Sequence, residues 1–299
     1  MGLEEKSYNL HEQSFINTEV EKELGRYRNW FDNPTTDLWR HTRMLSVLDP
    51  FLQDQKGASW LTVGDGRFGT SATYINRNGG KALPTDIDTK LLDIAKQNNV
   101  ISDFAYANAE KLPFADGEFD FSYCKQAYHH FPRPILAVYE MLRVSNQAII
   151  FTEPHDYVPA PFIRSILQNI KHLLKKISGK KIDHYDTGNY ETIGNYIYTI
   201  SVREMEKIAQ GIGLPCIAYK LFHDEYVVGV ENEMFSENAP LYKKIRSAIT
   251  QNSIKTALRI TNPNTVQMII FKIVPKDNII TSLEQDGYTI VTFPGNPYI

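Results

Sequence analysis

Three glycines directly follow a short apolar run, in a pattern that is typical of nucleoside-binding turns. The apolar run covers residues 59–63, and Gly64, Gly66 and Gly69 come next. Glycine lets the backbone turn sharply and approach a ligand without a Cβ atom in the way. Asp86 lies 22 residues after Gly64, at the end of the next apolar run, where a carboxylate can accept hydrogen bonds from both hydroxyls of a ribose. We therefore predict a nucleoside-bearing ligand at this turn.

A second group of reactive side chains follows two later apolar runs. His129, His130, Glu153 and His155 would all reach the carboxyl edge of a parallel sheet, where such folds bind ligands. A histidine suits a general base because its ordinary pKa is near neutral. We predict that this group supplies the catalytic base, and that one of the two adjacent histidines packs or caps. A candidate site for a divalent metal is also formed by His129, Glu153, His155 and Asp156.

The elements that must position these residues can be read from the hydrophobic pattern. Strands are predicted over residues 59–63, 82–85, 104–107, 119–124, 148–152, 217–222 and 265–274. Helices are predicted over residues 70–78, 90–98, 135–143 and 201–210. This alternation requires right-handed crossovers and predicts an α/β fold with a Rossmann-like, doubly wound sheet, mostly parallel with an antiparallel last strand.

Changes in composition and hydrophobic pattern along the chain suggest its domain organisation. We expect an N-terminal helical cap at 1–57, an α/β core at 58–153, a helical lid insert at 154–200, completion of the sheet at 201–275 with a second insert at 231–262, and a tail at 276–299. In the cap, one helix is expected from Phe15 to Phe31, and a second is expected to be capped by Thr36 or Asp37 and to end at Pro50. Ser201 and Glu204 form a capping-box pattern, and residues 288–293 of the tail are strand-like.

Composition excludes several classes of protein. The chain has 299 residues, of which 42% are hydrophobic and 22% charged, with a net charge of −3. An apolar fraction of this size is typical of globular proteins, and the near-neutral charge argues against a general nucleic-acid binder. The first residues lack a signal peptide's apolar region, and no run is long enough to span a membrane. Two cysteines cannot form a disulfide framework. We expect a cytoplasmic enzyme.

Three further motifs indicate which nucleoside is bound. They are Asn108–Phe114, Gly117–Phe121 and Cys124–Phe131, each next to a predicted strand. With the glycine turn, they make residues 58–154 resemble the class I S-adenosylmethionine-dependent methyltransferases, especially the small-molecule branch with methyltransferase domain 11. The resemblance implies S-adenosyl-L-methionine as cofactor and no metal.

The resemblance also assigns cofactor-binding positions. Gly64, Asp65 and Gly66 would face the methionine part of the cofactor, and Asp86 would hold the ribose. Ile87 would lie against the adenine. Asn108, at a position where the family often has Asp, would accept a hydrogen bond from the adenine amino group, and Ala109 would offer its backbone N–H. Lys125 and Gln126 would lie near the sulfonium or the acceptor.

The sequence departs from the family pattern at the first turn. Thr62 stands where an acid is common, Phe68 occupies the position of the usual third glycine, and Asp65 replaces a small residue. These differences leave unassigned how the amino-acid end of the cofactor is held. Arg40 or Arg43 could pair with its carboxylate, but a solvated charge on a helix surface is the alternative interpretation that we favour.

The inserts give the only indications about the acceptor. Residues 164–181 interleave Lys and Arg with Ile and Leu, which predicts a basic amphipathic helix. A solvated lid helix is one interpretation; attraction for a phosphate-bearing acceptor or peripheral contact with a membrane is another. Tyr185, Tyr190, Tyr196 and Tyr198 can stack on sugar faces or simply pack. We expect a small hydroxylated acceptor, such as a sugar or glycan intermediate, that is methylated on oxygen.

Two other functions remain open from the sequence. The same glycine turn would serve an NAD(P)-dependent oxidoreductase. Thr62 and Phe68 also leave room for a methyltransferase-like scaffold subunit without catalysis. The oligomeric state is not predicted.

Overall fold

The structure, a computed structural model, describes Tyr8, residues 33–156, Ile166, Ile170, Leu173, Leu174, Ile177, Ser178 and residues 196–295. The helix expected from Phe15 to Phe31 and most of the expected lid insert, 154–200, lie outside the described residues. No helix in the described ranges combines the length and the hydrophobicity that crossing a bilayer requires.

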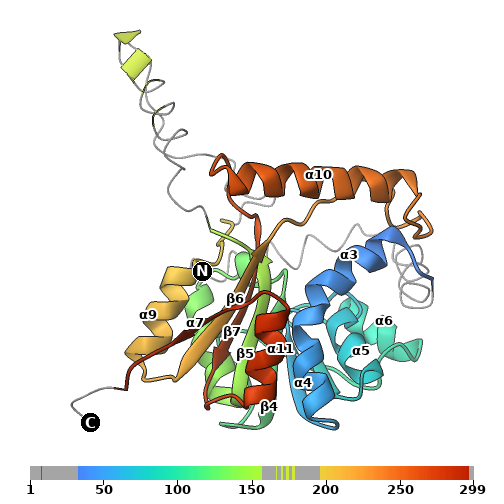
Figure 1. Ribbon diagram of the computed structural model, residues 1–299. Coiled ribbons are helices and arrows are strands. Elements are labelled where there is room, and N and C mark those ends of the chain that lie inside the picture. The colour runs from blue at the N-terminus through green and yellow to red at the C-terminus, as the bar shows by residue number, and fades with distance from the viewer. Residues whose placement is uncertain are drawn as a thin grey trace.

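In the described part of the chain, eight strands form one sheet in the order β3-β2-β1-β4-β5-β7-β6-β8 (Figure 1). The bounds are β1 Ser59–Val63, β2 Lys81–Asp86, β3 Ala105–Tyr106, β4 Phe119–Lys125, β5 Ser145–Pro154, β6 Cys216–Phe222, β7 Thr265–Phe271 and β8 Thr289–Thr292. Strands β1 to β5 pair in parallel, whereas β7 runs antiparallel to β5 and β6. The predicted doubly wound α/β fold is confirmed, and β8 adds a second antiparallel strand next to β6.

Strand register brings the functional loops together. Val63, the last residue of β1, is paired with Thr85 of β2 and with Cys124 of β4. The residues after these three strands therefore emerge side by side at one edge of the sheet. These residues include Gly64 and the segment that follows Lys125.

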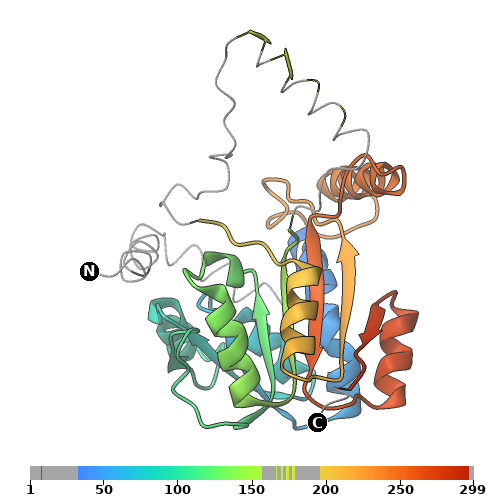
Figure 2. The ribbon, with the colours of Figure 1, turned by 90° about the vertical axis from the view of Figure 1, so that its left-hand side faces the viewer.

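Helices cover both faces of this sheet. The helix α7 (Pro134–Val144) and the helix α9 (Val202–Gly211) pack on one face, nearest the viewer in Figure 2. The short helices η1 (Ser46–Leu48) and α4 (Asp49–Asp54), with α11 (Asp277–Gln285), pack on the other. Because neighbouring strand residues point to opposite faces, Trp60 and Leu61 enter different layers, and both are fully buried. Burial on both faces explains the continuous apolar runs of the central strands.

The predicted helices of the core are present, with ends shifted by at most one residue. They are α5 (Thr70–Arg77), α6 (Lys90–Gln97), α7 and α9. A short helix, η2 (Tyr128–His130), follows β4 and was not predicted. Phe68, Leu91, Leu92, Ala95 and Ile101 form a small cluster under α6. Phe68 is fully buried there, which explains why a large residue replaces the usual glycine at its position.

Three expectations about helix ends were wrong. Thr35, rather than Thr36 or Asp37, caps α3 (Thr36–Leu45) by accepting a hydrogen bond from Leu38 N at 3.1 Å. Pro50 does not end a helix but lies in the first turn of α4, where its missing N–H costs nothing. Ser201 does precede α9, but its side chain makes no capping hydrogen bond.

The segments after β6 add one helix near the carboxyl ends of the strands and complete the sheet. The second insert forms α10 (Pro240–Ala257), which is held to α3 through Glu233: its carboxylate accepts hydrogen bonds from Thr36 Oγ1 and from the backbone N–H groups of Leu241 and Tyr242. In the tail, α11 packs on α4, and β8 lies within the predicted strand 288–293. The tail therefore packs on the core. The division into cap, core, lid and tail remains a proposal.

Candidate active site

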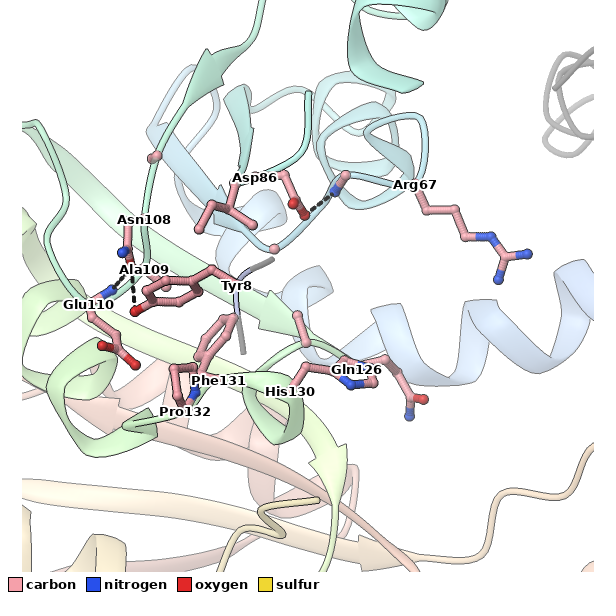
Figure 3. Close-up of a pocket in the computed structure, with 15 residues that line it drawn as sticks. Tyr8, Arg67, Asp86, Asn108, Ala109, Glu110, Gln126, His130, Phe131 and Pro132 are labelled. Carbon is pink, nitrogen blue, oxygen red and sulfur yellow. Dashed lines mark hydrogen bonds between the residues drawn. The ribbon is translucent and has the colours of Figure 1, made fainter. Parts of the chain in front are cut away.

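A cavity opens at the carboxyl ends of the parallel strands (Figure 3). Its empty space, including solvent at the mouth, is about 940 Å3. The lining residues come from the turns after β1 to β4 and from the N-terminal segment: Tyr8, Gly64, Gly66, Arg67, Asp86, Ile87, Ala107, Asn108, Ala109, Glu110, Gln126, Ala127, His130, Phe131 and Pro132. Six of the eight predicted cofactor-binding residues line this cavity.

The first turn needs glycine at two positions. Gly64 has φ of +70°, and a Cβ atom there would collide with the Cβ of Ala127. A Cβ on Gly66 would lie 2.5 Å from the carboxylate of Asp86. The bare backbone is therefore what allows the turn after β1 to lie between the turns after β2 and β4, beside the cavity.

Asp86 connects the first turn to the end of β2. One carboxylate oxygen accepts a hydrogen bond from Gly66 N at 2.8 Å, and the other accepts one from Asp88 N at 2.9 Å. Each carboxylate oxygen has two lone pairs, so one backbone hydrogen bond does not saturate it. The side chain lines the cavity, as the ribose assignment requires.

Asn108 lies at the opposite wall. Its Oδ1 accepts a hydrogen bond from Glu110 N at 2.9 Å, which fixes the side chain, and a longer one from the phenol of Tyr8 at 3.5 Å. Figure 3 shows the Tyr8 ring inside the cavity, with its hydroxyl toward Asn108. Burial, followed by a hydrogen bond to Glu110, raises the pKa of Tyr8. Tyr8 thus contacts the oxygen that we assigned to the adenine amino group.

Replacing Tyr8 by Phe should therefore tighten cofactor binding, because the mutation removes the donor that competes for Asn108 Oδ1 but retains the ring. One net hydrogen bond corresponds to about 0.5–1.5 kcal/mol, so S-adenosylhomocysteine should bind about two- to tenfold more tightly in calorimetry. Weaker binding by the Tyr8→Phe variant would instead mean that the phenol helps to hold the cofactor.

Asp65 is not among the residues that line the cavity. Its buried carboxylate accepts hydrogen bonds from Ser71 N at 3.1 Å, from Ala72 N at 2.9 Å and from Thr62 Oγ1 at 2.9 Å. It caps the first turn of α5, where Gly69 offers no side chain. Burial raises the pKa of this carboxyl despite these three donors. Thr62 and Asp65, which both depart from the family pattern, are therefore explained as one buried hydrogen-bonded unit. Asp65 lies behind the turn and does not line the cavity.

We expect the Asp65→Ala variant to lose stability without losing cofactor affinity per folded molecule. Two backbone N–H groups of α5 would lose their acceptor in a buried site, which costs about 1–3 kcal/mol each. The free energy of unfolding in urea should fall by about 2–4 kcal/mol. A variant of unchanged stability, or a folded variant with much weaker cofactor binding, would contradict this structural role.

Lys125 also lies outside the cavity lining. It is buried beside His41, with Nζ 3.3 Å from His41 Nδ1. Burial lowers the pKa of Lys125, an effect that the Asp65 carboxylate opposes, and burial together with Lys125 holds the pKa of His41 well below its ordinary value. A neutral His41 can accept a hydrogen bond from the ammonium group. Lys125 is thus a buried cation at the end of β4 and not a wall of the cavity.

The two arginines considered for the cofactor carboxylate have other partners. Arg40 pairs with Asp224 at 2.6 Å and contacts Asp37 at 3.4 Å. Arg43 donates a hydrogen bond to the carbonyl of His223 and lies over the ring of Trp39. Neither arginine is a fully solvated surface charge, so that interpretation was wrong. Neither lines the cavity, and pairing with the cofactor carboxylate stays a prediction.

The base candidates divide into two groups. Glu153 is fully buried: one oxygen accepts hydrogen bonds from Ala127 N and Tyr128 N, and the other lies 2.7 Å from His129 Nδ1. The rings of His129 and His130 have centroids 3.9 Å apart, and His130 lines the cavity. Glu153 therefore holds the turn after β4 and orients His129. His129 in turn packs against His130, the histidine that lines the cavity.

His155 lies apart from this cavity. Its Nδ1 is 3.2 Å from the carbonyl oxygen of Pro263, and burial lowers its pKa. Asp156 accepts a hydrogen bond from the hydroxyl of Thr199. Within the described ranges, no three His, Cys, Asp or Glu side chains are arranged to hold a metal ion. His155 was thus drawn into the candidate group only by its position after β5.

Several cavity residues were missed by the sequence reading. Tyr8 is more than 50 residues upstream of β1, and no local pattern connects it to the site. Phe131 and Pro132 follow η2, a turn that was not predicted. Glu110 is held by Arg133 through a 2.7 Å ion pair that only the folded chain forms. Arg67 was quoted only as part of the glycine turn, and Figure 3 shows its guanidinium directed away from the cavity.

Comparison with known proteins agrees with the geometry. Residues 61–149 match the family model described as methyltransferase domain, Methyltransf_11. Phosphoethanolamine N-methyltransferase 2 of Haemonchus contortus, solved with S-adenosyl-L-methionine, is similar with a TM-score of 0.52 at 16% identity, covering 88% of this chain and 60% of that one. No curated protein sequence matches the chain.

Two further solved structures are more distant. The YcgJ protein of Bacillus subtilis has a TM-score of 0.49 at 16% identity, covering 79% of this chain and all of that one. A methyltransferase of Methanosarcina mazei has a TM-score of 0.44 at 14% identity, covering 76% and 98%. At such identities, structural likeness shows the fold alone.

The sheet and its cavity define an α/β enzyme that binds a nucleoside-bearing ligand at the switch between strands. The matched domain, which contains the glycine turn, specifies the class. Residues 61–149 match the methyltransferase domain model, so the protein is an S-adenosylmethionine-dependent methyltransferase, and its cofactor is S-adenosyl-L-methionine. The oxidoreductase and scaffold alternatives are thereby set aside.

Proposed function

We propose that this methyltransferase transfers a methyl group to a hydroxyl oxygen of a small, hydroxylated acceptor. The observation that carries the proposal is His130, whose imidazole lines the cavity beside a turn fixed by the buried Glu153. Methylation of a hydroxyl requires a group that accepts its proton, whereas a carboxylate or a neutral amine needs little more than orientation. A histidine supported in this way suits the first case.

The cavity fits the cofactor, and we assign its walls accordingly. The close approach of Gly66 to Asp86 leaves the first turn without side chains where the cofactor would lie. We assign Asp86 to the ribose hydroxyls, Ile87 to one face of the adenine, and Asn108 with the N–H of Ala109 to its edge. When bound, S-adenosyl-L-methionine supplies an electrophilic methyl group on a sulfonium.

The chain's own residues then have three tasks in the reaction. The cavity walls hold the acceptor oxygen in line with the methyl group and exclude water, which is the main source of rate in such displacements. His130 takes the hydroxyl proton. His129, held by Glu153 at 2.7 Å, supports the ring of His130.

A pair of tyrosines favours a sugar-like acceptor. Tyr196 and Tyr198 pack edge to face with centroids 4.8 Å apart, and each is more than a third exposed. Tyr198 N donates a hydrogen bond to the carbonyl of His129, which ties the pair to the catalytic turn. Exposed tyrosines of this kind offer ring faces to sugars and hydroxyl groups for hydrogen bonds. We therefore propose a sugar or glycan intermediate as the acceptor class.

A screen with isotopically labelled methyl donor tests this proposal. Panels of hydroxylated compounds, amines and carboxylic acids would be incubated with the full chain, and the position of the label determined by mass spectrometry and NMR. An O-methylated hydroxyl compound is the expected product. A product methylated on nitrogen, carbon or a carboxylate would overturn the assignment while leaving the class of enzyme intact.

The Glu153→Gln variant tests how the histidines are positioned. The amide retains an oxygen for the N–H groups of Ala127 and Tyr128, but its NH2 group faces His129 Nδ1 and favours the other tautomer. We expect kcat to fall about tenfold to a hundredfold, because the support of the base and not the base itself is lost. KM for the methyl donor should stay within about twofold; unchanged kcat would show that this contact has no role in turnover.

A further inference from the structure

Two inserts of the chain are strongly basic although the protein is not. Residues 158–182 contain six Lys or Arg and residues 238–262 contain five, and neither range contains an Asp or Glu. The whole chain has a net charge of −3, so the residues outside these two ranges together carry −14. Such a separation of charge indicates a partner that is anionic over a wide area.

The first insert also leaves an apolar stripe uncovered. Ile166, Ile170, Leu173, Leu174 and Ile177 are helical, and their spacing places them on one side of a helix. Their exposed fractions run from 42% at Ile166 to 75% at Ile177. The fold itself therefore does not bury this stripe, although five large aliphatic side chains at such positions would normally be buried.

The second insert, which contains α10, also combines basic residues with exposed aliphatic side chains. Ile245 and Ile249 of this helix are buried against Val230. Ile254 lies about 180° around the helix from Ile245, at 3.6 residues per turn, and is 56% exposed. Leu258, just after α10, is 62% exposed. The outward side of α10 thus carries uncovered aliphatic side chains in a segment whose only charged residues are basic.

Topology puts both inserts at the end of the molecule where the cavity opens. The first follows β5, and the second connects β6 to the antiparallel β7, so both emerge at the carboxyl ends of β1 to β5. In Figures 1 and 2, α10 lies across this end, and the helical pieces of the first insert lie beyond it.

We propose that these two inserts form a docking surface for an anionic lipid bilayer. Lys and Arg would meet the phosphate groups, and the exposed Ile and Leu would enter the boundary with the acyl chains, as in helices that lie in the plane of a membrane surface. Nucleic acid would satisfy the basic groups but offers no place for the aliphatic ones. Docking directs the mouth of the cavity toward the bilayer. The proposal goes beyond the assigned reaction and does not depend on it.

Flotation of the full chain with vesicles tests the surface directly. We expect binding to vesicles of phosphatidylcholine with about 30 mol% phosphatidylglycerol and almost none to pure phosphatidylcholine. Raising NaCl from about 0.1 to about 0.5 M should weaken the binding at least tenfold, because the Debye length shortens. No binding to the anionic vesicles, or binding that ignores salt, would overturn the proposal.

Two variants and a matched control locate the contact. Reversing Lys175 and Lys176 to Glu should lower the partition coefficient at least tenfold, since each basic residue near such a surface contributes about fivefold. Replacing Leu173 and Leu174 by Ser should have a similar effect. Lys56→Glu with Lys81→Glu makes the same charge change on exposed residues at the opposite edge of the sheet, and should change binding less than about threefold.

Other occupants of the surface would give different results. Equal losses in the control and in the insert variants would show general charge attraction and overturn the assignment. So would a wild-type chain that binds RNA but no vesicles, or one that forms dimers which the Leu173→Ser and Leu174→Ser changes dissociate. A thermal shift with S-adenosylhomocysteine, unchanged in every variant, confirms that the fold is intact.

Discussion

The His130→Asn variant is expected to bind S-adenosylhomocysteine like the wild type and to transfer methyl groups about 10²- to 10⁴-fold more slowly, the usual range for loss of a general base. Asparagine retains a polar side chain at the wall of the cavity but cannot take the proton of a hydroxyl acceptor. The change should therefore appear in kcat under saturating donor and acceptor.

The pH dependence of the rate distinguishes loss of the general base from a distorted cavity. The wild-type rate should fall as the pH is lowered, because a protonated imidazole cannot accept a proton. In the His130→Asn variant this acid limb should disappear. The matched variant His155→Asn changes a histidine that is bound to Pro263 and lies outside the cavity, so it should retain the rate and the limb. A His130→Asn enzyme of normal rate would refute the role of this residue.

The Asp86→Ala variant is expected to show the largest loss of cofactor affinity. Two charge-assisted hydrogen bonds to the ribose would be lost, weakening the binding of S-adenosylhomocysteine by about 2–4 kcal/mol, or roughly 30- to 1,000-fold. The structure adds a second cause, since Gly66 N and Asp88 N would lose their acceptor as well. Titration calorimetry measures the effect.

Two further variants distinguish the ribose contact from support of the turn. Asp86→Asn retains one acceptor oxygen and should give an intermediate loss. Asp88→Asn changes the adjacent acid, which is buried but does not line the cavity, and should alter the affinity by less than about threefold. If Asp86→Ala binds the cofactor as tightly as the wild type, Asp86 does not hold the ribose.

The pattern of residues along the chain was sufficient to predict the sheet and one half of the cavity. Alternating apolar runs and helices specify the crossovers, and the parallel register then places Gly64, Asp86 and Asn108 together, because each lies at or just after the end of a strand. Residues whose role depends only on their position after a strand could therefore be predicted. The antiparallel direction of β7 was predicted as well, whereas the order of the strands came from the structure.

The roles of the remaining polar residues depend on contacts that the sequence does not reveal. Asp65 and Lys125 are adjacent to cavity residues in sequence, but the first caps α5 and the second is buried against His41. Tyr8 enters the cavity from a distant segment. The physical reason is that strand position fixes where a backbone emerges, whereas the direction and the partner of a side chain depend on packing between segments far apart in the chain.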